Sequence, residues 1–570
     1  MARRRPPSFR ILILIALTAS AGRLQAGAEE GQVTLMDPVF VEASPVSSGA
    51  AMEKPWRYLS EPGFEILSRC SNAFNADYAR ALRRAAAARL ALLPENFWGD
   101  LPTPIKIVLY DRPPERIGFL SSSPIDLSWI AEDSAILGSD SIRLSHPVTL
   151  GDGDTFINCG NYWDVQADNS DFSLDVDSSI LIENRVPHFP AWFVAGLEGP
   201  NGLYVNRTLG WTLRGDTMTL PNALWTSSAE TIALQKAARR ASKEKVERKP
   251  PALLPLERLF DGAVPAEQRK LWNAEAALFV RWGLFGSGDR QAFLDFVDRS
   301  AREPITEALF RQHLGIGYSD AQKALGEYLL VAVGEPIAVP FTVPPDKPVN
   351  FREATPTEVA RILGDWGRLE ARSPEEYSHD FRRESLDQAD KLYERIFARR
   401  EDDPLFLAGF GLYELQTEDN LRARNALKAA TAAGVVRPRA YVELARLRLE
   451  ESLPSDQEGI GDLSRDEFAE IVALLNTARL QMPSLRSTYF VLARAFEHAP
   501  SKPTLGDLWP LSEGVRLFPQ NSNLAYSVAT LYRRLGYTDE AASMAHRAIA
   551  FAETDGDRSL LSGLLARLAK

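Results

Sequence analysis

The sequence predicts an α+β fold for the first half of the chain and an all-α array for the second half. Three observations favour this division. Strand-like segments occur between Phe64 and Leu144, and mainly helical patterns follow Pro187. A proline-dense stretch then covers residues 335–348. Beyond it, the chain is helical throughout and small side chains recur at regular spacing.

Length and composition limit the classes of protein to which the chain can belong. The 570 residues exceed the ~250–300 at which a single hydrophobic core stops growing, so we expect more than one domain. A hydrophobic content of 45% with 25% charged residues excludes a largely disordered chain. The net charge of −11 argues against nucleic acid as a partner, because phosphate binding requires a basic excess. With only 6 histidines and 2 cysteines, metal chemistry is restricted.

Residues 1–27 have the pattern of a secretory signal peptide. A basic start precedes an apolar run from Ile11 to Ala21, and small residues follow near Ala26. The apolar run is shorter than the ~20 residues that span a bilayer, although a retained membrane anchor is the alternative. We therefore expect a periplasmic or extracellular protein with no stable membrane span after signal removal. Residues 28–60 are expected to form an extended lead-in.

If the protein is exported, its two cysteines can form a disulfide bond. In an oxidising compartment, Cys70 and Cys159 can form a disulfide that would stabilise the fold by roughly 4 kcal/mol. Alternatively, each is buried separately as a small hydrophobic side chain. The sequence does not decide between these two interpretations. Two cysteines so far apart in the sequence do not make a zinc site.

Residues 61–334 are expected to form the α+β domain. Phe64–Leu67 alternates like a strand, and Asn75–Leu93 is an alanine-rich amphipathic helix. Pro104–Leu109 predicts a second strand, with the proline at its start, where no ladder hydrogen bond is lost. Further short strands are expected through Ile136–Leu144. A proline-rich linker at 335–350 ends this domain, because proline fixes φ and favours extended backbone.

Residues 351–570 are predicted to form a helical repeat array. In the segment Ser522–Asp555, small and apolar residues recur at the spacing of two antiparallel helices, with Gly536 ending the first helix. This segment closely resembles the tetratricopeptide repeat (TPR), whose unit is about 34 residues. Weaker units contain Gly411–Ala430 and Leu444–Pro483, another begins near Ala493, and Glu358–Arg399 is a further helical pair. The resemblance implies a curved solenoid that binds a protein or peptide on its concave face.

A short motif in the first half resembles a second family. Pro190–Glu198 reads Pro-Ala-Trp-Phe-Val-Ala-Gly-Leu-Glu. It is similar to the Pro-x-Trp-Phe-x-Glu-Gly-Leu-Ala-Glu segment of gluzincin (peptidase MA-like) metallopeptidases. Leu254–Phe260, Trp272–Phe285 and Arg311–Leu330 stand where that family has its following segments. The resemblance covers about Phe64 to Leu330 and implies a zincin-like fold.

The chemistry of that family is missing from the sequence. A zinc peptidase of this kind needs two histidines at i and i+4 on one helical face, with a glutamate between them as general base. No two histidines are four residues apart, and the upstream helix at Leu174–Asn184 has none. The position of the family's third ligand is Ala195. The chain is therefore expected to be a non-catalytic pseudopeptidase with no catalytic residues, no metal ligands and no cofactor.

By the same resemblance, the remnant of the motif lines the former cleft. The remnant residues are Trp192, Phe193, Ala195, Gly196 and Glu198. The rival interpretation is an active metal-dependent hydrolase with atypical ligands, which would be Glu183 and His188 together with Asp175 or Asp177. A third is that the first half is only a spacer and the array alone binds.

Several further aspartates offer oxygen ligands that would suit calcium. They are Asp152, Asp154, Asp164, Asp168, Asp171, Asp175 and Asp177. Their spacing does not match an EF-hand, and a solvated acidic loop is the favoured interpretation.

Overall fold

The computed structural model describes residues 55–99, 101, 103–110, 148–161, 180–182, 184–198, 212–244, 251–261, 265–372, 379–399, 402–453, 463–552 and 555–568. Lys54–Lys570 form one compact unit. The predicted signal peptide and most of the lead-in lie outside the described residues, so export stays a prediction. Among the residues described, no helix has the length and hydrophobicity needed to cross a bilayer.

A six-stranded mixed sheet forms the centre of the first half, in the order β4-β5-β3-β2-β1-β9. The strands are β1 (Arg57–Glu61), β2 (Phe64–Ser68), β3 (Ile105–Tyr110), β4 (Val148–Gly151), β5 (Phe156–Asn161) and β9 (Arg352–Glu353). The three central strands β2, β3 and β5 are parallel, with Ile66 opposite Ile107. Their antiparallel neighbours β1 and β4 enclose them. The predicted strands at Phe64 and Pro104 are thus adjacent in the sheet.

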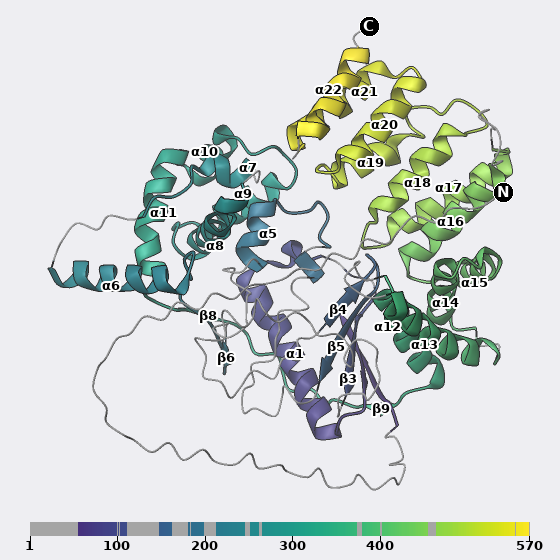
Figure 1. The fold of residues 1–570 in the computed structure, drawn as a ribbon, viewed down its shortest axis with the longest axis horizontal. Coiled ribbons are helices and arrows are strands. Elements are labelled where there is room, and N and C mark those ends of the chain that lie inside the picture. The colour runs from purple at the N-terminus through teal and green to yellow at the C-terminus, as the bar shows by residue number, and fades with distance from the viewer. Residues whose placement is uncertain are drawn as a thin grey trace, which may run out of the picture. The chain divides into compact units, whose positions relative to one another are not determined.

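The two faces of this sheet pack against helices from different halves of the chain (Figure 1). Ile105, Ile107 and Leu109 alternate onto one face, where they join the core beneath α1 (Asn72–Leu92). Val108 belongs to the opposite face and packs with α12 (Pro356–Glu370), the first helix after the predicted linker. The face that carries Val108 is therefore covered by a helix from the second half of the chain.

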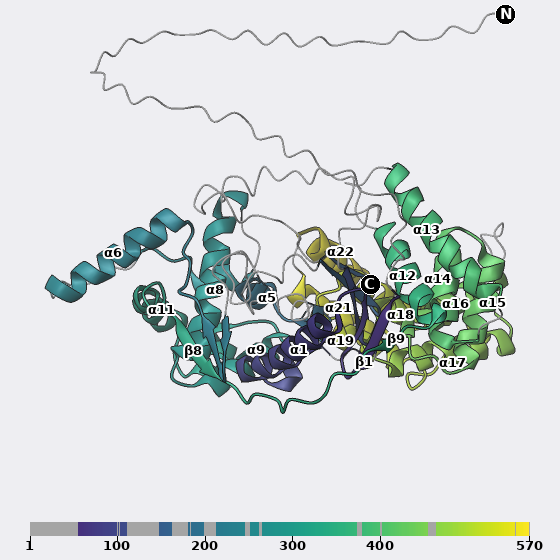
Figure 2. The same cartoon turned by 90° about the horizontal axis from the view of Figure 1, so that it is seen from below.

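The remainder of the first half is mainly helical around a large aromatic core. Its helices are α5 (Ala191–Glu198), α6 (Ser228–Glu244), α7 (Leu256–Asp261), α8 (Arg269–Phe285), α9 (Arg290–Ser300), α10 (Glu307–Leu314) and α11 (Tyr318–Ala332). A three-stranded sheet adjoins them, made of β6 (Thr212–Arg214), β7 (Thr217–Leu220) and β8 (Ile337–Pro340). Figure 2 shows α6 projecting from this part of the fold beside α11. Strand β8 lies inside the predicted linker.

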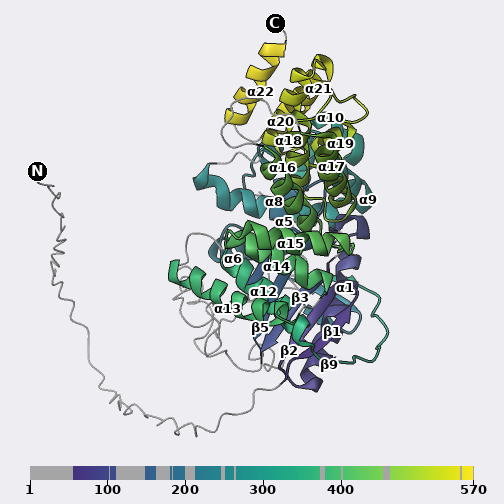
Figure 3. The ribbon, with the colours of Figure 1, turned by 90° about the vertical axis from the view of Figure 1, so that its right-hand side faces the viewer.

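Beyond β9 the described residues form an array of antiparallel helix pairs (Figure 3). The helices after α12 are α13 (His379–Phe397), α14 (Pro404–Gln416), α15 (Asn420–Ala432), α16 (Pro438–Ser452), α17 (Arg465–Leu480), α18 (Arg486–Glu497), α19 (Trp509–Leu517), α20 (Ser522–Arg534), α21 (Thr538–Phe551) and α22 (Asp555–Leu568). The first helices of successive pairs, α12, α14, α16, α18, α20 and α22, pack in a row. This confirms the predicted TPR-like array.

The strongest predicted repeat unit corresponds to α20 and α21. The Asn521 side chain accepts a hydrogen bond from the Leu524 amide and caps the start of α20. Gly536 has φ of 83°, a left-handed conformation that glycine adopts without steric cost, and it terminates the first helix. Ala529 of α20 and Ala545 of α21 are buried in one small cluster, so their small size permits the close approach of the two helices.

One edge of the array contacts the first half. The first turn of α16 reaches the β4–β5 turn, where the Arg439 amide donates to Asp154 Oδ2 at 2.7 Å. Further along, the ring of His188 lies 5.8 Å from that of Phe518, which precedes α20. Residues on both sides of the predicted 335–350 linker thus belong to one packed unit. The division of the chain into two domains at that linker stays a prediction.

Candidate binding site

The Trp-Phe motif lies in the hydrophobic core of the first half. Trp192 and Phe193 are 1% and 0% exposed, and the Trp192 ring contacts that of Phe279 at 5.2 Å between centroids. Gly196 faces α8, where a Cβ would lie 2.6 Å from the Ala276 carbonyl oxygen. The short helix α5 is therefore anchored to α8 by the Trp192 ring and one close backbone contact, and the Phe193 ring contacts Phe293 of α9. Burial assigns the two aromatic residues to packing, not to the surface of a cleft.

The other predicted site residues are not brought together by the described structure. Ala195 is half-buried against the same core, and the side chain of Glu198 lies outside the described residues, as does Glu183. His188 is half-buried. Within the described ranges, no group of three or more His, Cys, Asp or Glu side chains is placed to hold a metal ion. The atypical-ligand hydrolase thus stays a prediction.

The predicted cysteine pair is described only in part. Cys70 is buried in the core between the sheet and α1. The backbone of Cys159 pairs with Val108 across β3 and β5, but its side chain lies outside the described residues. The disulfide therefore stays a prediction.

Two of the acidic-loop aspartates are not solvated, which corrects the sequence-based expectation for them. The carboxylates of Asp152 and Asp154 are fully buried between the sheet and the array. Arg368 Nη2 lies 2.8 Å from Asp152 Oδ2, and Arg437 Nε lies 3.6 Å from Asp154 Oδ1. Both arginines lie more than 200 residues further along the chain, so local sequence gave no indication of these partners. The aspartates from Asp164 to Asp177 lie outside the described residues.

These aspartates belong to a larger group, which we call the buried ionic cluster. Its members are Lys106, Asp152, Asp154, Asp365, Arg368 and Arg437. Asp365 accepts hydrogen bonds from Arg368 Nη2 at 3.0 Å and from Arg437 Nη1 and Nη2 at 3.1 Å each. Lys106 Nζ lies 3.9 Å from Asp365 Oδ2. Three carboxylates thus meet three buried cations at the junction of β3, the β4–β5 turn, α12 and the N-cap of α16. The partly exposed Arg439 adds a fourth cation, since its Nε lies 3.7 Å from Asp152 Oδ2.

The protonation equilibria of this cluster follow from burial and pairing. Burial opposes ionisation of Asp365, but Arg437, Arg368 and Lys106 outweigh it and hold the pKa of Asp365 well below its usual range. Burial lowers the pKa of Lys106 to about 8, although Asp365 opposes the shift. Burial and the neighbouring Asp152 raise the pKa of Asp154 to about 6. The cluster is paired and buried, so it suits a structural junction and not a site that admits a substrate.

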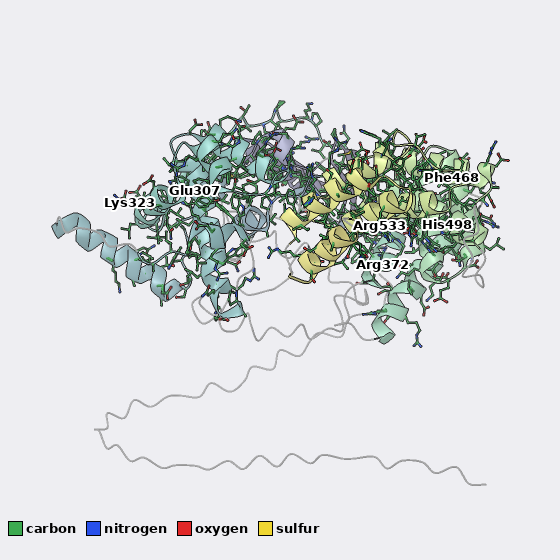
Figure 4. All side chains as sticks on the ribbon, turned by 90° about the horizontal axis from the view of Figure 1, so that it is seen from above. Glu307, Lys323, Arg372, Phe468, His498 and Arg533 are labelled. Carbon is green, nitrogen blue, oxygen red and sulfur yellow. The ribbon has the colours of Figure 1, made fainter. Side chains whose placement is uncertain are left out.

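A cavity of about 840 Å³ is large enough to hold a ligand. It lies where the helices of the first half meet the last repeats. The first half contributes Pro190, Ala191, Glu257, Arg258, Phe260, Asp261, Ser300, Glu303, Pro304, Ile305, Thr306, Glu307 and Tyr318. The array contributes Gln520, Ala550, Phe551, Ala552 and Arg558. Figure 4 shows Glu307 on the helices of the first half and Arg533 on the C-terminal repeats.

The cavity has aromatic walls and a charged rim. Tyr318 contacts the Phe260 ring at 5.6 Å and the Phe310 ring at 4.9 Å between centroids. The Tyr318 amide donates to Glu307 Oε1 at 3.3 Å. Burial, followed by the negative charges of Glu257 and Glu307, raises the pKa of the Tyr318 hydroxyl, so it stays protonated. The site thus offers apolar surface together with a neutral hydroxyl and carboxylates.

Sequence reasoning did not find this cavity, because its walls come from segments about 300 residues apart. In the sequence, Leu254–Phe260 is distinguished only by its similarity to a segment of the peptidase family. No local pattern links Glu257 to Tyr318 or to Arg558. Only the packing of α7, α10 and α11 beside the last repeats brings them together.

Comparisons with known proteins do not identify a family for this chain. No family model matches the chain, and no curated protein matches it. Among solved structures, one similar chain is a thermophilic TPR protein of Thermus thermophilus. The two share 17% sequence identity, and the match covers 37% of this chain and 99% of that chain, with a TM-score of 0.24. The assignment of the second half as a TPR-like array therefore depends on the packing observed between its helices.

Proposed function

We propose that this protein is a non-catalytic binding protein that holds a peptide segment of a partner protein. The observation that supports the proposal is the row of stacked helix pairs from α12 to α22. Arrays of this kind present extended surfaces, and binding of proteins or peptides is their usual role. The cavity beside the last repeats has the volume typical of ligand pockets, about 300–1,000 Å³.

The first half is proposed to be a gluzincin-like domain that has lost its zinc site. The absence of histidines four residues apart supports this, since the metal-bound water of such enzymes needs that pair. The same proposal places the mature protein in the periplasm or outside the cell, on the basis of the basic and apolar segments of residues 1–27.

The pseudopeptidase proposal is tested by metal content and turnover. The purified full chain is expected to contain far less than one zinc per molecule and to leave a broad peptide library uncleaved. Stoichiometric zinc, with hydrolysis that a chelator abolishes, would overturn the proposal. If hydrolysis is found, the variants Glu183→Ala and His188→Ala show whether the atypical ligands are responsible.

The binding proposal is tested by site-specific cross-linking of the full chain in an extract of the cell envelope. A photo-reactive residue replaces Thr306, an exposed residue on the rim of the cavity. The control position is Arg80, which is exposed on α1 and does not line the cavity. A protein cross-linked from position 306 and not from position 80 is the expected result. Equal yields at the two positions would contradict the proposal.

A further inference from the structure

The rim of the cavity carries more negative than positive side chains. Four carboxylates face two guanidinium groups. They are Glu257, Asp261, Glu303 and Glu307 against Arg258 and Arg558. Arg558 is already engaged, since its Nη2 lies 3.7 Å from Asp261 Oδ1. Among the four lining carboxylates, Glu257 is the one for which the described residues provide no ion pair, and this unpaired charge favours a cationic ligand over an anionic one.

Glu257 is the carboxylate most available to such a ligand. It is exposed on α7, and among the described residues it has no ion pair. Glu303 and Glu307 are partly neutralised, because Arg299 Nη2 lies 2.8 Å from Glu303 and Arg311 Nη2 lies 2.9 Å from Glu307. A ligand cation at Glu257 would gain an ion pair without displacing an existing one.

Tyr318 supplies a second, independent element of recognition. Its side chain lines the cavity yet is only 8% exposed, and no described residue is hydrogen-bonded to its hydroxyl. The ring of Phe260 lies beside it. Aromatic faces attract ammonium and guanidinium groups, and the free hydroxyl can accept a hydrogen bond from either.

We propose that the cavity binds a lysine or arginine side chain in an extended segment of a partner protein. The cation pairs with Glu257 and the Tyr318 hydroxyl, next to the ring of Phe260. Neighbouring residues of the segment pack on the apolar wall formed by Ile305 and Phe551. This inference rests on the proposed binding function and specifies the chemistry that the partner must present.

The test uses the full chain and an array of heptapeptides that are randomised except for a fixed central Lys, Arg, Glu or Leu. Stronger retention of the Lys and Arg sets than of the Glu and Leu sets is expected, and it should decrease with added salt. The variant Glu257→Gln should weaken binding to the Lys set by about threefold to tenfold. Tyr318→Phe, which keeps the ring, should weaken it less.

Arg258→Gln is the matched control, because it removes a charge of opposite sign from the next position of α7. It should leave binding to the Lys set unchanged or strengthen it. Preference for the Glu set, or a Glu257→Gln variant that binds as the parent does, would overturn the cationic assignment while leaving the binding function intact. Failure of the full chain to retain any set would contradict both proposals.

Discussion

The six side chains of the buried ionic cluster come from four separate segments of the chain. Removing charges from water is costly, and pairing offsets that cost only when every member keeps its partners. Asp365 is the central member, because it accepts hydrogen bonds from Arg368 and Arg437 and lies near Lys106. Neutralising it would leave three buried cations with only two carboxylates.

The variant Asp365→Asn is therefore expected to destabilise the protein by about 3–5 kcal/mol, the typical result of breaking a buried pair from one side. The measurement is the free energy of unfolding in urea. The control is Asp77→Asn, whose carboxylate pairs with Arg80 on the exposed surface of α1 and is 65% exposed. It should cost less than about 1 kcal/mol. Similar losses in the two variants would contradict the structural role of the cluster.

Glu275 is an isolated carboxyl group in the interior of α8. It is 0% exposed, and its Oε2 accepts a hydrogen bond from the Leu254 amide at 2.7 Å. Burial raises its pKa to about 8, with the Leu254 hydrogen bond opposing the shift. Since the folded protein holds this proton more tightly than the unfolded chain, the contribution of Glu275 to stability falls as pH rises from about 4.5 to about 8.

Replacing Glu275 with Gln should remove this dependence. The variant is expected to gain stability relative to the parent as pH rises through that window, and its difference from the parent should be constant above about pH 8. Unfolding curves recorded at several pH values measure the effect. A difference that does not change between pH 5 and pH 8 would show that Glu275 is ionised in the folded protein.

At the scale of elements, small residues determine how closely neighbouring helices pack. Gly514 of α19 faces Tyr489 of α18, where a Cβ would lie 2.5 Å from the tyrosine ring. Tyr489 is fully buried and cannot move away into solvent. The helix pair therefore requires glycine at this position for reasons of space, although glycine lowers helix propensity.

Gly514→Ala is expected to destabilise the protein by about 1–3 kcal/mol through overpacking, despite the better helix propensity of alanine. Gly563→Ala is the control, because Gly563 is exposed on α22 and a Cβ there meets no atom within 4 Å outside the neighbouring helix backbone. That substitution should stabilise the protein by up to about 1 kcal/mol. Thermal unfolding measures both, and the two shifts should have opposite signs. Shifts of the same sign would contradict the close packing of α18 and α19.

For the whole molecule, the central observation is that the two halves share a core. Helix α12 covers one face of the sheet, with Trp366 and Leu369 packed against Leu67 and Val108. The buried ionic cluster lies at the same junction. The array is therefore attached to the first half by buried apolar area and by paired charges, and we expect the two halves to stay together without the linker.

This expectation is tested by cutting the linker. A recognition sequence for a site-specific protease is inserted within residues 342–346, which have no regular secondary structure and are mostly exposed. After cleavage, the two fragments should elute together in size-exclusion chromatography at physiological salt. When the same cleavage site is placed in the Asp365→Asn variant, the two fragments should separate more readily after cleavage. Fragments that part immediately in the parent would show that the halves are independent domains.

The sequence by itself determined the local elements. It indicated the strands at Phe64 and Pro104, the alanine-rich helix between them, and the helix pair α20–α21, because periodicity and glycine placement act over a few residues. The missing histidine pair was also visible from spacing alone. The gluzincin-like fold and the export of the protein remain sequence-based predictions.

Only the tertiary structure decided which distant groups meet. Asp152 and Asp154 have the composition of a solvated loop, yet Arg368 and Arg437 bury them. The cavity likewise depends on α7 and α11 lying beside the last repeats. Burial and charge pairing depend on distances in space between segments hundreds of residues apart, whereas sequence patterns report only on neighbours along the chain.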